Sequence, residues 1–142
     1  MVLINDRLTN HFRLGEFACG DKAYISPDFI NFVFNVVEPF RVWYSRPVNI
    51  NSGYRTDAHN RYVGGDSDSL HLVGLAIDFD WPKEFSRYSA GRKSQFLINV
   101  RNKWFALWNK AGGHGQMTVH DGWVHLGISK SRPYYSDRRK YK

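Results

Sequence analysis

The dipeptide Asp121-Gly122 constrains the fold of this chain more than any other short segment. Asp-Gly favours the two-residue turn of a β-hairpin, and apolar and polar residues alternate on both sides of it. With this turn, Thr118 lies opposite His125, and alternate side chains share one face of the hairpin. We therefore expect an apolar face that packs on a core. The opposite, polar face would carry Gln116, Thr118, His120, Trp123, His125 and Gly127.

Two long amphipathic segments predict the helices that cover the apolar face of this hairpin. The first follows Ser26-Pro27, a favourable helix start, and Pro39 should kink or stop it near its end. The second covers roughly residues 90–111 and ends at Gly112-Gly113. The apolar positions that recur with helical spacing are Phe29, Phe32, Val33, Val36, Val37 and Phe40 in the first helix, and Leu97, Val100, Trp104, Leu107, Trp108 and Ala111 in the second.

Shorter patterns complete the expected fold. Residues 47–53 and 75–81 are typical of strands, and residues 56–63 can form a short helix that ends at Gly64-Gly65. We find no internal repeat or long linker, so residues 1–142 should form a single domain. The predicted class is α+β, with a small antiparallel sheet and helices packed on one of its faces. The polar face is then where a metal site would lie.

Composition excludes several classes of protein and leaves the basic charge to be explained. No stretch approaches the ~20 apolar residues of a membrane span, the N-terminus lacks the pattern of a signal peptide, and Cys19 has no cysteine partner. The net charge is +7, and basic side chains gather in a tail at about residues 130–142. Such a tail attracts polyanions, either nucleic acid or anionic wall polymers. For the last half-dozen residues, a solvated and partly frayed end is the simpler expectation.

Three residues form a candidate metal site. His71 precedes the predicted strand that contains Asp78, and His125 lies on the polar face of the hairpin. Two imidazoles and one carboxylate suit Zn²⁺ and leave a fourth position for water, which the metal would activate as a nucleophile. A histidine beside a strand and an aspartate at a strand end also occur for structural reasons, so this pattern alone leaves both interpretations open.

The residues around these three resemble a known family. Ser69-x-His71-x-x-Gly74-x-Ala76-x-Asp78 is similar to the first metal motif of the zinc D-Ala-D-Ala carboxypeptidases, which include vancomycin-resistance D,D-dipeptidases and phage L-alanyl-D-glutamate endolysins. The resemblance covers nearly the whole chain and implies a hedgehog-like fold. It extends to Phe12-Arg-Leu-Gly-Glu16-Phe17, Ser52-Gly53-Tyr54-Arg55, His59-Asn60, Val63-Gly64-Gly65, Gly112-Gly113-His114-Gly115 and Trp123-Val124-His125.

This resemblance implies one zinc ion held by His71, Asp78 and His125, and a substrate drawn from the stem peptides of peptidoglycan. Arg55 takes the position of the arginine that holds a substrate carbonyl or carboxylate, and a guanidinium can also stabilise an oxyanion. A structural salt bridge is the alternative role for Arg55. Ser69 and Trp123 are expected to contact the substrate. The reaction would be that of a D,D-carboxypeptidase or of an L-Ala-D-Glu-type endopeptidase.

The general base is where the sequence departs from the family. Many relatives have an acid three residues before the last zinc ligand, where this chain has Gly122, and others have one two residues after it, where this chain has Gly127. His120 and Asp121 are the remaining candidates for proton transfer. His120 shares the predicted face of His125, whereas Asp121 can equally be a residue of the turn.

These departures keep two other functions open. The domain could hold zinc but act as a weakly active or inactive peptidoglycan-binding module, because fold alone does not imply activity. A basic nucleic-acid module would explain the charge but not the metal motif. For the peptidase we expect action on the cell wall, as a phage lysis or virion protein or as a bacterial enzyme that is cytoplasmic until it is released.

Overall fold

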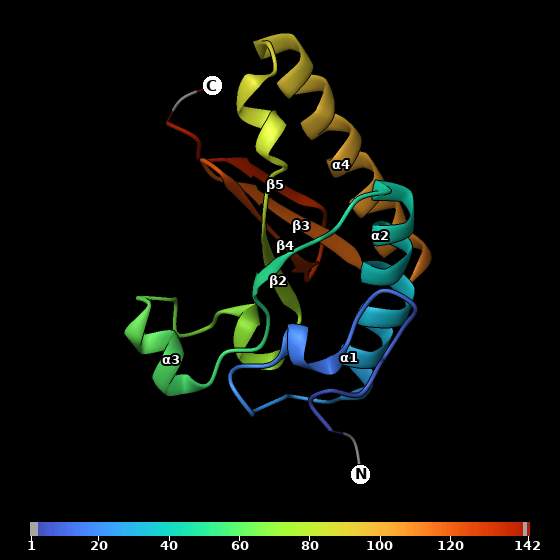
Figure 1. Ribbon diagram of the computed structural model, residues 1–142, viewed down its shortest axis with the longest axis vertical. Helices are drawn as coiled ribbons and strands as arrows, with labels where there is room; N and C mark the ends of the chain where they lie inside the picture. Colours follow the sequence, from blue (N-terminus) through green and yellow to red (C-terminus); the bar gives the residue numbers. More distant parts are fainter. Residues whose placement is uncertain (1–2, 141) are drawn as a thin grey trace.

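The computed structural model describes residues 3–140 and 142 of the chain, and its centre is a five-stranded mixed sheet (Figure 1). The strand order is β1-β2-β4-β3-β5. Met1 and Val2 of the segment inspected for a signal peptide, and Tyr141 of the basic tail, lie outside the described residues. The strands are β1 (Ile50–Ser52), β2 (Ala76–Asp80), β3 (His114–Val119), β4 (Trp123–Ser129) and β5 (Tyr134–Asp137).

The hairpin has the register expected from its turn. Thr118 pairs with His125 and Met117 with Leu126 in the antiparallel β3–β4 ladder. Gly122 has a φ of +80° in the turn, a conformation that glycine adopts at little cost. Strand β2 pairs antiparallel with the other edge of β4 and places Asp78 directly opposite His125. Two residues 47 positions apart in the chain are thereby fixed side by side.

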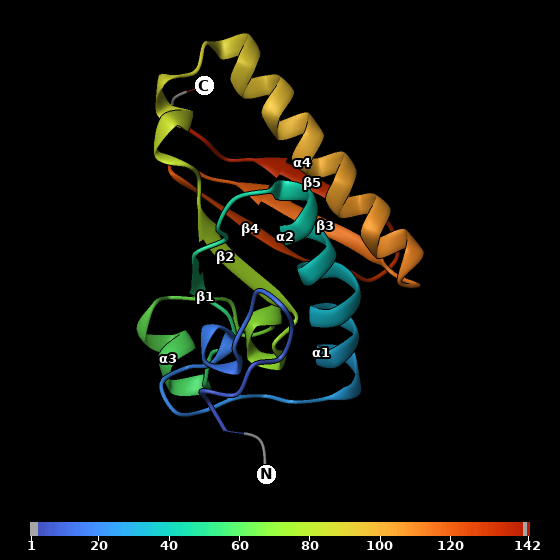
Figure 2. The ribbon, with the colours of Figure 1, turned by 45° about the vertical axis from the view of Figure 1, so that its right-hand side comes forward.

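The helices lie on one face of the sheet, as Figure 2 shows for α1, α2 and α4. The apolar faces predicted for the two long helices are buried, apart from the partly buried Ala111. Trp104 is fully buried, and its indole N–H donates to the carbonyl of Gly127 in β4 at 3.0 Å. The helical segments are η1 (Leu14–Phe17), α1 (Pro27–Phe32), η2 (Val33–Val37), α2 (Glu38–Tyr44), α3 (Asp57–Tyr62), η3 (Leu70–Val73), η4 (Lys83–Arg87) and α4 (Ala90–Lys110).

Pro39 does not stop the first helix, which runs on to Tyr44. The five residues before α2 form the π-helical turn η2, so Pro39 occupies the first turn of α2. The hydrogen-bond pattern changes directly before Pro39, because the Glu38 N–H donates to the carbonyl of Val33, five residues back. This π-helical turn is a local widening of the helix.

Strand β5 corrects the expectation of a wholly antiparallel sheet. It runs parallel to β3, with Gln116 beside Tyr134 and Thr118 beside Ser136. Strand β4 ends beside the start of β3, so the short connection 130–133 brings β5 to the free edge of β3 in the same direction. The α+β class and the placement of the helices on one face are confirmed. No helix among the described residues is long and apolar enough to cross a membrane.

Candidate metal centre

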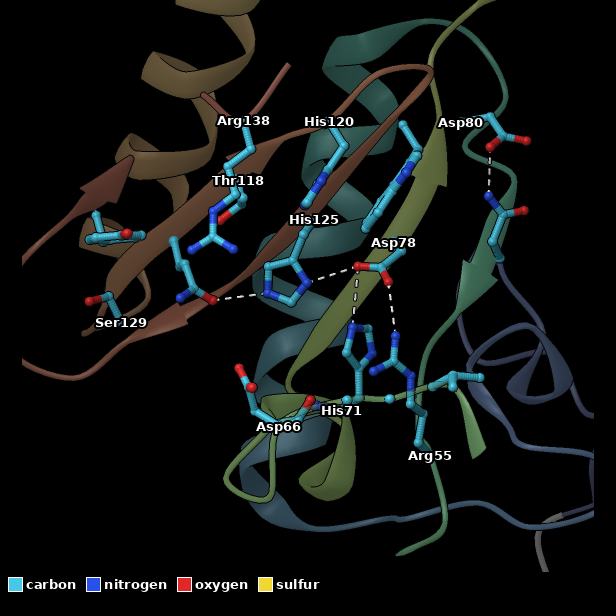
Figure 3. Close-up of a pocket in the computed structure, with 18 residues that line it drawn as sticks. Arg55, Asp66, His71, Asp78, Asp80, Thr118, His120, His125, Ser129 and Arg138 are labelled. Atoms are coloured by element: carbon cyan, nitrogen blue, oxygen red, sulfur yellow. Dashed lines mark hydrogen bonds and ion pairs between the residues drawn. The ribbon is translucent and has the colours of Figure 1, made fainter. Parts of the chain in front are cut away.

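His71, Asp78 and His125 meet on the face of the sheet that the long helices leave uncovered (Figure 3). One possible ligand atom from each lies within 4.8 Å of the others. His71 comes from η3, where the Ser69 hydroxyl accepts the backbone N–H of His71 at 3.2 Å. Asp78 and His125 come from the central strands β2 and β4. The sheet and one short helical turn therefore bring together all three residues that the sequence analysis named.

The hydrogen bonds of the two imidazoles indicate that a cation belongs at this point. His71 Nδ1 lies 2.7 Å from the carbonyl oxygen of Gly53, which only an N–H group can satisfy. The other nitrogen of a neutral His71, Nε2, then directs a lone pair at Asp78 Oδ1, 3.2 Å away. His125 Nδ1 approaches the same oxygen at 2.8 Å. Because one carboxylate oxygen faces both of these nitrogens, either each nitrogen carries a proton or a metal ion lies among the three groups. The donor set therefore fits a divalent metal such as zinc.

The surroundings of Asp78 favour the ionised form of its carboxyl group. Its side chain is only 8% exposed, and burial alone would raise its pKa. The hydrogen bonds to His125 and His71 outweigh that effect and hold the pKa of Asp78 far below its usual range. The carboxylate charge is thus available throughout the neutral pH range.

Arg55 lies beside the cluster and is held by three side chains. Its Nη2 is 3.2 Å from Asp78 Oδ2, and its side chain is 15% exposed. The other bonds go from Nε to Ser52 Oγ at 2.9 Å and from Nη1 to Asn60 Oδ1 at 3.3 Å. A guanidinium has five N–H donors, so two remain for a ligand in the cleft. The salt bridge considered as the alternative role of Arg55 is present, and two N–H donors of the guanidinium remain unused.

Two further residues support the cluster from behind. Gln116 Oε1 lies 2.9 Å from His125 Nε2 and fixes the ring that turns Nδ1 toward Asp78. Asn60 is buried, and its amide group also donates to the carbonyl of Asp66 at 2.8 Å, so it ties Arg55 to the neighbouring loop. The sequence placed Gln116 on the polar face without a role. It included Asn60 in the family resemblance but gave this residue no role.

The cluster lies at the bottom of a cleft of about 900 Å³. Ser69, His120 and Trp123 all line it. The His120 ring stacks on the Trp123 indole with ring centres 3.8 Å apart and planes 3° apart. Burial lowers the pKa of His120, the carboxylate of Asp78 opposes that shift, and the positive charge of Arg138 adds to it. The lowered pKa of His120 favours its neutral form.

Asp121 does not reach this cleft. Its carboxylate accepts the backbone N–H of Lys140 at 3.0 Å, and it lines a separate cavity with Trp81 and Arg139. The hairpin has the tight two-residue turn, so Asp121 stays at the tip of the hairpin rather than on the face of His125. Of the two candidates for proton transfer, His120 is therefore the one that lines the cleft.

The C-terminal segment adds residues to the cleft that the sequence analysis did not name. Ser129, Tyr134 and Arg138 line it together with residues from β2, β3 and β4. Residues 134–138 lack the apolar–polar alternation that predicts a half-buried strand, and basic residues surround them. Nothing in the sequence indicated which strand they would join.

Comparison with known proteins gives the same assignment as the geometry. No curated protein sequence matches the chain significantly. A family model described as Peptidase M15 matches residues 10–127, which include every residue of the cluster, all of β2 and the part of β4 that carries His125. This match confirms the resemblance to the zinc D-Ala-D-Ala carboxypeptidases, and the mixed sheet with its helices is consistent with their fold. The chain therefore belongs to the peptidase M15 family.

Proposed function

We propose that the protein is a zinc-dependent peptidase that hydrolyses a bond in the stem peptide of peptidoglycan. The observation that carries this proposal is the single Asp78 oxygen that faces imidazole nitrogens of both His71 and His125, at the bottom of an open cleft in a member of a peptidase family. These three residues would hold the metal. Bound there, zinc would lower the pKa of a water molecule and polarise the scissile carbonyl.

Arg55 would position the substrate. Its three side-chain bonds fix the guanidinium beside Asp78, so little ordering remains to be done when a substrate binds. The two remaining N–H donors can bind the scissile carbonyl oxygen and stabilise the negative charge that develops on it. This role requires the arginine side chain itself, because lysine cannot make the three bonds in the same plane.

His120 would transfer the proton. It lines the cleft on the same face as His125, and its lowered pKa favours the neutral form that can accept a proton. Its stacking on Trp123 fixes the plane of the ring. Trp123 and Ser69 would form the walls that contact the peptide, and the basic side chains of residues 130–142 would attract anionic wall polymers.

One observation favours a second function, that of a zinc-containing peptidoglycan-binding module with little or no activity. Gly122 occupies the position where many relatives have an acidic general base, and Asp121 does not replace it in the cleft. Under this alternative the same cleft would bind stem peptides, and His120 would not support turnover.

Digestion of purified peptidoglycan by the zinc-loaded protein tests the proposal. Mass spectrometry identifies each released fragment, so free D-Ala would indicate a D,D-carboxypeptidase and separated stem peptides an L-Ala-D-Glu-type endopeptidase. His125→Ala is the control for metal dependence. Release by the unaltered protein and none by the variant is the expected result. No release, with about one zinc bound per chain, would favour the binding module.

A further inference from the structure

The part of the chain beyond the family match supplies one wall of the cleft. The match ends at residue 127, whereas β5 covers Tyr134–Asp137. Tyr134 and Ser136 pair with Gln116 and Thr118, so their side chains share the face that carries the metal centre. Tyr135 points to the opposite face, where the Arg101 guanidinium of α4 lies 5.4 Å from its ring. This alternation continues to Arg138, which lines the cleft.

The backbone around Arg138 is fixed although its guanidinium is not. The Arg138 N–H donates to the Val119 carbonyl at 2.8 Å, which extends the parallel ladder past β5. Next to it, Arg139 forms an ion pair with Asp137 at 2.8 Å, and the Lys140 N–H donates to Asp121 at 3.0 Å. The Arg138 side chain is exposed and forms no hydrogen bond or ion pair with any other described residue. The fixed backbone thus places the Arg138 side chain at the cleft, and all five N–H donors of its guanidinium are available for a ligand.

Arg138 and Arg55 lie on opposite sides of the His71–Asp78–His125 cluster (Figure 3). None of the three acidic residues that line the cleft, Asp66, Asp78 and Asp80, forms an ion pair with Arg138. Asp78 is paired with Arg55, and Asp80 accepts the amide of Asn51 at 2.7 Å. The Arg138 charge is felt within the cleft, since it contributes to the lowered pKa of His120. Hydroxyl groups of Ser129 and Tyr134 line the same cleft and can add hydrogen bonds.

We infer that Arg138 binds a carboxylate of the substrate on the side of the scissile bond away from Arg55, and so selects acidic peptides. This inference rests on the proposed function. A guanidinium and a carboxylate form two parallel charge-assisted hydrogen bonds, which an amide in place of the carboxylate cannot match. The specificity would belong to this chain, since Arg138 lies outside the segment shared with the family.

A pair of synthetic stem peptides that differ only in one group tests the inference, one with a free side-chain carboxylate and one with the corresponding amide. Arg138→Gln should lower kcat/KM and binding affinity for the carboxylate peptide by about tenfold and leave both unchanged for the amide peptide. Zinc content should not change. Arg132→Gln is the matched control, because it removes the same charge from an exposed side chain of the same segment that does not line the cleft.

The outcomes separate this inference from the proposed function because binding is measured by calorimetry alongside hydrolysis. Three results would overturn the carboxylate site and leave the proposed peptidase activity intact. Hydrolysis could be unchanged by Arg138→Gln, it could fall equally for both peptides, or it could fall to the same extent in Arg132→Gln. Arg138-dependent binding of the carboxylate peptide without hydrolysis would support the site and count against the peptidase. Absence of both binding and hydrolysis would contradict both.

Discussion

Replacement of Arg55 by alanine should damage turnover far more than it damages zinc binding. In the unaltered protein, Arg55 neutralises one oxygen of the buried Asp78 carboxylate and makes two further side-chain bonds. Loss of one partner of a buried ion pair costs about 3–5 kcal/mol. Here Asp78 keeps two imidazole partners at its other oxygen, and Arg55 is partly exposed. We therefore expect Arg55→Ala to lower the free energy of unfolding of the metal-free protein by about 2–3 kcal/mol.

Catalysis should fall by a larger factor. Removal of one preorganised donor from a developing oxyanion costs about 10²–10³ in kcat. Urea denaturation with and without zinc gives the stability change, and steady-state hydrolysis of a stem peptide gives kcat and KM. Arg46→Ala is the control, because the partly exposed Arg46 pairs with Glu84 at 3.3 Å and neither residue lines the cleft. An Arg55→Ala protein with bound zinc and normal kcat would refute the oxyanion role.

Three further predictions concern the metal and the proton. His71→Ala, Asp78→Ala and His125→Ala should each abolish zinc retention measured by elemental analysis after dialysis, and activity with it; a fully zinc-loaded variant would exclude that residue as a ligand. Gln116→Leu should weaken zinc binding by roughly 10–100-fold in competition with a chelator, since it frees the His125 ring; unchanged affinity would show that the amide is not needed. Burial lowers the pKa of His120, so its neutral, proton-accepting form persists to a pH below about 6.5. We expect kcat to fall as the pH drops through that pKa. His120→Gln should lower kcat by about 10²–10⁴ and remove this decrease at acidic pH. A decrease that persists in the variant would belong to another group.

The sequence was informative wherever one local rule decided the structure. The Asp121-Gly122 turn fixes the β3–β4 register, and that register puts His125 on the polar face. The apolar periodicity of residues 29–40 and 97–108 identifies the buried faces of both long helices. Ser26 and Pro27 start α1 as expected, because the Ser26 hydroxyl accepts the Phe29 N–H at 3.0 Å.

Long-range pairings were beyond the sequence because no local rule specifies them. The direction of β5 depends on where β4 ends relative to β3, which is known only after the whole sheet is assembled. The bonds of Gln116 to His125 and of Asn60 to Arg55 join different elements of the fold and leave no periodic signal. At Pro39, local helix rules predict a kink or an end of the helix. The helix instead continues through a π-helical turn directly before α2.

The central claim is that His71, Asp78 and His125 together bind one catalytic zinc ion. Diffraction from crystals of the zinc-loaded protein, recorded on both sides of the zinc absorption edge, tests it most directly. The account predicts one anomalous peak, bonded to His71 Nε2, a carboxylate oxygen of Asp78 and His125 Nδ1, at about 2.0–2.2 Å from each. A peak elsewhere, or an empty cluster at saturating zinc, would contradict the metal centre and with it the proposed peptidase.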